Sequence, residues 1–170
     1  MLVPLLLSLA ALLLPADDPR AQLVAGVDAI ASPGHPGGVT VFGPDAWPIL
    51  MGGRVPIAAA AEAEGGDAGR LVALTQGGYV GAGVVGTADT ERFLRNAMAW
   101  LSGGKKKPLL AQVGGGTCAL ADALGLVTAD DWLDADVLVA NTGSLPPHLL
   151  PTVRAFLADG GGVLAGDTPW

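Results

Sequence analysis

The residue in this sequence with the character of an enzyme nucleophile is Cys118, its only cysteine. It lies between a predicted strand and a predicted helix, where a helix N-terminus can lower a thiol pKa and where α/β hydrolases place their nucleophile. The segment lacks the second glycine of that hydrolase turn. Neither His35, in a Pro-Gly turn, nor His148, in a proline-rich helix start, is placed to act as its base. A catalytic thiol and a buried apolar cysteine therefore both stay open as interpretations.

Polar residues follow several of the predicted strands and form a second candidate site. Gln76, Asn141 and Asp167 each come at or just after the carboxyl end of an apolar run, next to glycines. In a sheet with parallel strands, ligands bind in the crevice beyond these ends. We expect any small-molecule site to lie there, with these three side chains as its first candidates. The alternative is that they only form turns and cap helices.

The sequence predicts no metal or cofactor site. It contains no H-E-x-x-H zinc motif, and its glycine runs lack the lysine of a phosphate-binding P-loop. Asp130, Asp131, Asp134 and Asp136 lie close together, but the loop glycine and terminal glutamate of an EF-hand are missing. We interpret these four residues as a solvated acidic turn.

Composition favours one folded domain and argues against a nucleic-acid partner. The chain has 170 residues, of which 51% are hydrophobic. Its formal net charge is −7, whereas binding to phosphate backbones needs clustered lysine and arginine. The one basic run, at 105–107, reads as a solvated loop.

The first 14 residues form an apolar block that is too short for a membrane span, which needs about 20 residues. Its length is typical of the apolar region of a signal peptide. Cleavage is plausible after Ala16 or after Ala21. We predict a signal peptide at 1–21, a domain at 22–170, and a secreted or periplasmic protein without membrane attachment after cleavage.

The remaining sequence predicts an α/β fold whose halves differ. After a short helical pattern from 22 to 31, apolar runs at 39–42, 46–51, 55–63 and 70–76 alternate with Gly and Pro turns, as in a strand meander. From 89 onward, helical patterns at 89–102, 117–124 and 145–160 alternate with apolar strands at 108–113, 136–140 and 163–166. Such alternation indicates parallel strands with right-handed crossovers, in a three-layer sheet.

The end of the chain adds one expectation. Only four residues follow the strand at 163–166, so we predict a C-terminally truncated domain and leave open whether this strand pairs with residues beyond position 170. An unpaired strand there would promote aggregation.

Several segments resemble one protein family: RLVALTQGGYV, DTERFLRNAMAWLSGGKKKP, DVLVANTGSL and VRAFLADGGGVLAGDTPW. They are similar to the N-terminal region of the TRP-channel-associated factors and of bacterial proteins with an enhancin-like, mucin-directed zinc peptidase domain. The resemblance covers about 22–170. It implies a flavodoxin-like domain similar to class I glutamine amidotransferases, which precedes the peptidase.

This resemblance implies a non-catalytic accessory or binding domain of an exported metallopeptidase-like protein. The peptidase motif would lie outside the chain, and the amidotransferase triad is unmatched around Cys118. The implied partners are a glycoprotein or a cell-envelope component, together with the protein's own C-terminal region. The alternative function is a small hydrolase or amidotransferase relative that uses Cys118.

Overall fold

The computed structural model describes residues 18–34, 37–63, 69–113 and 118–166. Within them, a single mixed sheet has the strand order β1-β2-β3-β7-β6-β4-β5. Its strands are β1 Ala46–Gly52, β2 Val55–Glu62, β3 Arg70–Leu74, β4 Leu109–Val113, β5 Val127–Thr128, β6 Val137–Asn141 and β7 Gly162–Gly166. The order confirms the predicted α/β class.

The first half of the chain forms the predicted meander. β1 pairs with β2, and β2 with β3, all antiparallel. The alanine-rich β2 is a strand because β1 pairs with it along most of its length and β3 pairs with its residues 58–62, which overrides the helical preference of alanine. The predicted strand at 39–42 is wrong: Val39 donates a single backbone hydrogen bond to the carbonyl of Pro56, and no strand forms there.

The second half contributes four parallel strands, with β7 in the middle of the sheet. β7 pairs in parallel with β3 on one side and with β6 on the other, over all five of its residues. The last strand, β7, therefore has both of its pairing partners within the chain. This pairing joins the two halves, because β3 belongs to the meander and β6 to the parallel half.

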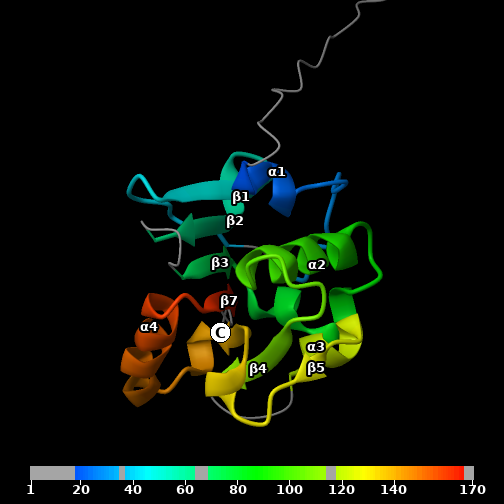
Figure 1. Ribbon diagram of the computed structural model, residues 1–170. Helices are drawn as coiled ribbons and strands as arrows, with labels where there is room; N and C mark the ends of the chain where they lie inside the picture. Colours follow the sequence, from blue (N-terminus) through cyan, green and yellow to red (C-terminus); the bar gives the residue numbers. More distant parts are fainter. Residues whose placement is uncertain (1–17, 35–36, 64–68, 114–117, 167–170) are drawn as a thin grey trace, which may run out of the picture.

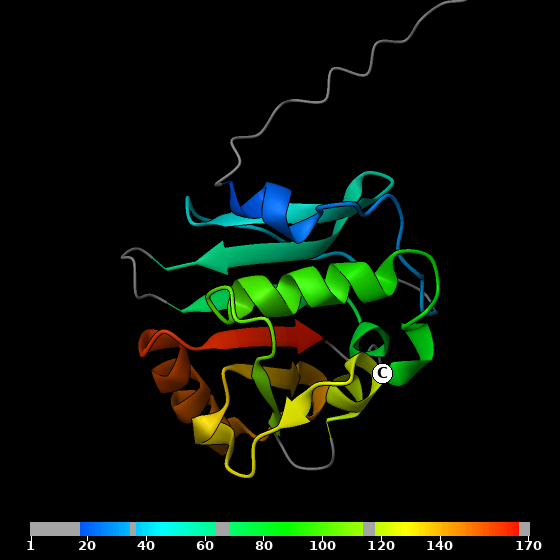
Figure 2. The same cartoon turned by 45° about the vertical axis from the view of Figure 1, so that its right-hand side comes forward.

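Helices cover both faces of the sheet and make three layers (Figure 1). The α-helices are α1 Pro19–Leu23, α2 Thr90–Leu101, α3 Ala119–Leu124 and α4 Leu150–Ala158. Short 3-10 turns are η1 Gly77–Val80, η2 Ala82–Val84, η3 Trp132–Asp134, η4 Thr142–Ser144 and η5 Pro147–Leu149. α2 and α3 lie on one side of the sheet and α4 on the other, and α2 crosses in front of the central strands (Figure 2). No helix in the described part of the chain combines the length and apolar character needed to cross a membrane.

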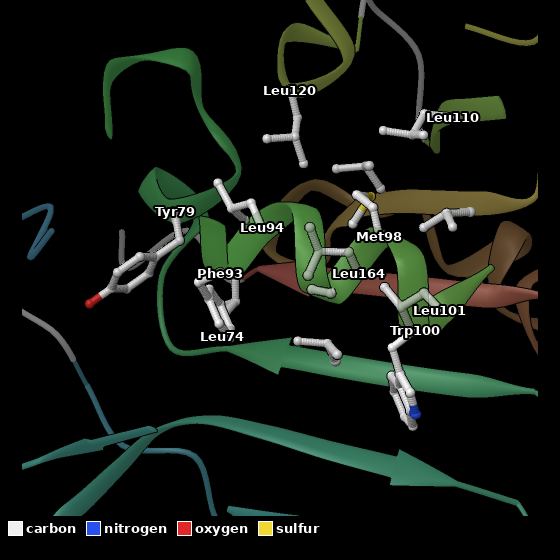
Figure 3. Close-up of a cluster of buried hydrophobic side chains, with 14 of the residues drawn as sticks. Leu74, Tyr79, Phe93, Leu94, Met98, Trp100, Leu101, Leu110, Leu120 and Leu164 are labelled. Atoms are coloured by element: carbon white, nitrogen blue, oxygen red, sulfur yellow. The ribbon is translucent and has the colours of Figure 1, made fainter. Parts of the chain in front are cut away.

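Each face of the sheet has its own hydrophobic core. On the α2 face, Phe93, Leu94, Met98 and Leu101 pack against the sheet around Leu164 of β7 (Figure 3). All five side chains are almost completely buried. Their helical spacing is the predicted apolar stripe at 89–102, so this part of the core is readable in the sequence. A smaller cluster fills the α4 face.

The N-terminal segment differs from its prediction in extent. The helix predicted at 22–31 is α1, which begins earlier, at Pro19, and ends at Leu23. Asp18 caps it by accepting a hydrogen bond from the Arg20 N–H at 2.8 Å, and Asn96 of α2 donates to the carbonyls of Leu23, its last residue, and of Ala25. The chain beyond α1 is held by Asp89, whose carboxylate accepts from the backbone of residues 28 and 29 rather than capping its own helix.

Candidate functional site

The sheet brings the predicted crevice residues to one edge. Leu74 of β3 and Asn141 of β6 are the register partners of Gly166, the last residue of β7, on its two sides. Gln76 follows β3 closely, and its backbone carbonyl would lie 3.2 Å from a Cβ added at Gly166. Asp167 lies outside the described residues. Gln76 and Asn141 thus flank the end of the central strand, as their positions in the sequence predict.

Gln76 is enclosed by the protein's own chain. It is only 8% exposed, and its Oε1 has no hydrogen-bond partner within the described part of the chain. Gly34 lies so close that a Cβ there would be 2.9 Å from Gln76 Nε2, and Pro33 packs against Gly78 in the same way. The segment around Gly34 therefore covers this part of the crevice.

Tyr79 lies beside Gln76 and is a residue that sequence reasoning missed. It is 1% exposed, and Figure 3 shows its hydroxyl pointing away from the apolar cluster. Burial raises the pKa of the phenol, and the nearby Ser32 side chain partly offsets this rise. The two hydroxyls do not satisfy hydrogen-bond geometry, so among the residues that the structure describes the Tyr79 hydroxyl has no partner. The sequence feature that could have drawn attention to Tyr79 is an aromatic residue in a glycine-rich turn.

Cys118 lies where predicted, at the N-cap of α3, yet its surroundings do not activate the thiol. The side chain is 3% exposed. Burial is the largest influence and raises its pKa, whereas N–H groups of Ala121 and Leu120 lower it, and the negative charge of Asp122 raises it further. The net result is a thiol that ionises less readily than a free cysteine, the opposite of an activated nucleophile.

A depression of about 320 Å³ lies next to Cys118. Trp132, Asp122 and Asp130 are among its other lining residues. No histidine lines it; His148 is exposed on η5, and His35 lies outside the described residues. Within the described ranges, the thiol therefore has no histidine beside it in this depression, and the carboxylates there are those of Asp122 and Asp130.

Two of the four clustered aspartates have structural roles. Asp131 caps η3 by accepting a hydrogen bond from the Leu133 N–H at 3.0 Å. Asp136 binds the Lys105 ammonium at 2.5 Å and accepts from the Leu109 N–H at 2.9 Å. Among the residues that the structure describes, no cluster of three or more His, Cys, Asp or Glu side chains could hold a metal ion.

The opposite edge of the sheet, where the parallel strands begin, holds hollows that the sequence did not predict. One of about 920 Å³ lies between the ends of α2 and α4, with Arg70, Lys105 and Asp136 in its lining. Arg70 also binds Glu62 at 2.7 Å and the carbonyl of Trp100 at 3.0 Å. An arginine at the start of an apolar strand was the only local signal, because these groups come from segments distant in the sequence.

Comparisons with solved structures support the fold. IMPa from Pseudomonas aeruginosa, in complex with an O-glycopeptide, is 23% identical, with a TM-score of 0.62, over 88% of this chain and 19% of that one. The IMPa metallopeptidase in complex with T-antigen is 24% identical, with a TM-score of 0.55, over 73% of this chain and 16% of that one. The present chain thus spans less than a fifth of the length of these proteins. At such identities the likeness is one of fold.

Comparison at the family level gives a broader match. No curated protein matches the sequence. A family model described as "TRPM8, N-terminal domain" matches residues 6–170. This range contains nearly the whole sequence, including every strand and helix described above. The chain therefore belongs to the family of TRPM8 N-terminal domains, TCAF_N.

Proposed function

We propose that this chain is a non-catalytic accessory domain of an exported, metallopeptidase-like protein, and that it binds a glycoprotein or cell-envelope component. In this proposal the peptidase part lies outside residues 1–170. Family membership supports it, as does the fold shared with IMPa, whose structures include complexes with T-antigen and with an O-glycopeptide. The part of those peptidases that matches is small, which suits an accessory role.

The observation that carries the non-catalytic assignment is the environment of Cys118. Nucleophilic thiols need a lowered pKa or an adjacent base. Here burial raises the pKa, and the depression beside the thiol is lined by aspartates, which disfavour a thiolate. We take the domain to be amidotransferase-like in its parallel sheet and in its cysteine at a strand-to-helix turn, without the corresponding activity.

Export is part of the same proposal and rests on the apolar block at 1–14. The predicted boundary after Ala21 falls inside α1, whose Leu23 is completely buried and whose cap is Asp18. Of the two candidate cleavage positions, the one after Ala16 leaves α1 whole. A secreted or periplasmic location follows from this reading.

Binding to a glycoprotein tests the proposed function directly. The full chain, purified after export, is passed over an immobilised mucin-type glycoprotein and over the same protein after enzymatic removal of its glycans. We expect saturable binding to the glycosylated surface, weaker binding to the stripped one, and no cleavage of either. Equal binding to both surfaces, or none to the glycosylated one, would contradict the proposal.

A cysteine-dependent hydrolase is the second candidate, favoured by the depression beside Cys118 and by the two N–H groups that point at its sulfur. Alkylation with iodoacetamide at neutral pH separates the two functions. The accessory-domain proposal predicts a thiol that reacts slowly in the folded protein and fast in denaturant. Fast, saturable labelling of the folded chain, absent in Cys118→Ser, would instead support a hydrolase.

A further inference from the structure

Two tryptophans lie in contact with each other near α1. Trp47 of β1 and Trp100 of α2 contact each other edge to face, with ring centroids 6.1 Å apart and planes at 74°. An arginine guanidinium lies over each ring. The guanidinium of Arg20 lies 5.8 Å from the centroid of the Trp47 ring, and that of Arg70 lies 5.6 Å from the centroid of the Trp100 ring. Figure 3 shows Trp100 extending from α2 towards the meander strands.

Adjacent depressions lie over these two pairs. The larger, of about 630 Å³, is lined by Arg20, Trp47 and the acidic residues Asp18, Asp45 and Glu62, among others. The smaller, of about 280 Å³, includes Arg70 and Trp100. Both share Pro19 and Glu62 in their lining, so they form one groove with two compartments. The larger compartment alone is within the range of small-ligand sites, about 300–1,000 Å³.

The groove presents hydrogen-bond donors and acceptors in fixed positions. Arg20 is exposed and stacked on Trp47, and its guanidinium makes no hydrogen bond or ion pair with the described residues. Asp45, also exposed, has no side-chain hydrogen bond within the same ranges. Glu62 is held by Arg70 at 2.7 Å, between the two compartments. Stacking on an aromatic ring orients a guanidinium and leaves its N–H groups free to donate.

We infer that this groove binds a neutral disaccharide unit, with one sugar in each compartment. Sugar hydroxyls both donate and accept, so they match a lining of carboxylates and guanidinium groups. The partly exposed Trp47 adds apolar surface for the C–H groups of a sugar, whereas Trp100 is only 5% exposed and lies beneath Arg70. The three carboxylates and the net charge of −7 disfavour sialylated or other acidic sugars. This inference rests on the proposed function and names the groove and the ligand class that serve it.

Calorimetric titration of the full chain tests the inference. The probes are lactose, maltose, N,N′-diacetylchitobiose and the T-antigen disaccharide, with sialyllactose as the acidic comparison. We expect at least one neutral disaccharide to bind, and sialyllactose to bind at least tenfold more weakly. No binding by any neutral probe at tens of millimolar, or stronger binding by sialyllactose, overturns the inference. So does stronger binding by a tetralysine peptide, which would identify a surface for cationic partners.

Three variants locate the site on the groove. Trp47→Ala and Asp45→Asn should each weaken binding of the neutral disaccharide at least tenfold. Asp45 is exposed and has no side-chain bond among the described residues, so its variant tests the groove even where Trp47→Ala fails to fold. Trp132→Ala is the matched control, a partly buried tryptophan in the separate depression beside Cys118. The Trp132→Ala variant should bind the neutral disaccharide as tightly as the unmodified chain does.

The glycoprotein assay distinguishes the two levels of the proposal. If the chain binds the glycosylated surface and the Trp47 and Asp45 variants bind it equally well, the groove assignment is wrong and the proposed function stands. If the chain binds no glycoprotein, the proposed function fails. The disaccharide titration then shows by itself whether the groove binds a neutral disaccharide.

Discussion

Replacing Gly162 by alanine tests the joint between the two halves of the sheet. Gly162 opens β7 and pairs with Arg70 of β3 and Val137 of β6. A Cβ added to it would lie 2.4 Å from the carbonyl oxygen of Leu101, at the end of α2. This is about 1 Å closer than an ordinary contact. Its φ lies outside the left-handed region, so any cost of the substitution comes from this close approach.

The structure sets the size of the effect. The clashing atom belongs to backbone, and β7 is held by strands on both sides, so neither partner moves aside easily. Overpacking of this kind costs about 1–3 kcal/mol. Alanine also has less conformational freedom than glycine in the unfolded chain, which by itself raises the free energy of unfolding by about 0.4–1 kcal/mol. We expect the free energy of unfolding to fall by about 1.3 kcal/mol, the difference between these two effects, which lowers Tm by roughly 3–5 °C for a domain of this size.

Gly83→Ala is the matched control for that experiment. Gly83 lies in η2 without positive φ, and an added Cβ there would meet nothing within 4 Å. Its Tm should equal or slightly exceed that of the unmodified chain. Thermal unfolding followed by circular dichroism gives both values. If the Gly162→Ala protein has the same Tm as the Gly83→Ala protein, the close approach of α2 to β7 is refuted.

Three further predictions concern the core, acid stability and an unpaired hydroxyl. Leu164→Ala, at a fully buried site on β7, should lower the free energy of unfolding by about 2–5 kcal/mol in a urea titration. N–H groups of Asp28 and Ala29 lower the pKa of Asp89, so Asp89 stabilises the fold above the ordinary aspartate pKa of about 3.9, and this stabilisation disappears as pH falls through the folded-state pKa. Asp89→Asn should therefore have a lower Tm than the unmodified chain at pH 7, and this difference should shrink in acid; a constant difference would contradict the assignment. Tyr79→Phe removes a buried hydroxyl without a partner, so denaturant unfolding should show unchanged stability or a gain of up to about 1 kcal/mol; a clear loss would reveal a hydrogen bond at that hydroxyl.

Regular patterns in the sequence were enough to predict most elements. The apolar stripe of α2, the unbroken run of β6 and the turn-bounded runs of β1, β2 and β3 each correspond to an observed element. Errors came where local pattern and long-range pairing disagree. The run at 39–42 alternates like a strand, yet only one backbone hydrogen bond, from Val39 to Pro56, connects it to the sheet. The predicted helix at 22–31 ends early because Asn96 binds the carbonyls of Leu23 and Ala25.

The candidate site was predictable in position but not in character. Parallel strands place their carboxyl ends together, so Gln76 and Asn141 lie on either side of the end of β7. Their sequence context could not show that Gln76 is enclosed by the segment at Gly34, or that burial raises the pKa of Cys118. Both facts depend on which distant segment covers a residue.

The sequence by itself determined the class of the fold, because hydrophobic periodicity is a local property that fixes which face of each helix or strand is buried. It also determined the acidic character of the chain and the position of its single thiol. Only the tertiary structure decided that β7 lies between β3 and β6, since strand order depends on contacts across the whole chain. The same is true of the groove at Trp47 and Trp100, whose lining comes from α1, β1, β2, β3, α2 and the turns beside them. Side chains so far apart in sequence have no common local pattern, and folding alone brings them together.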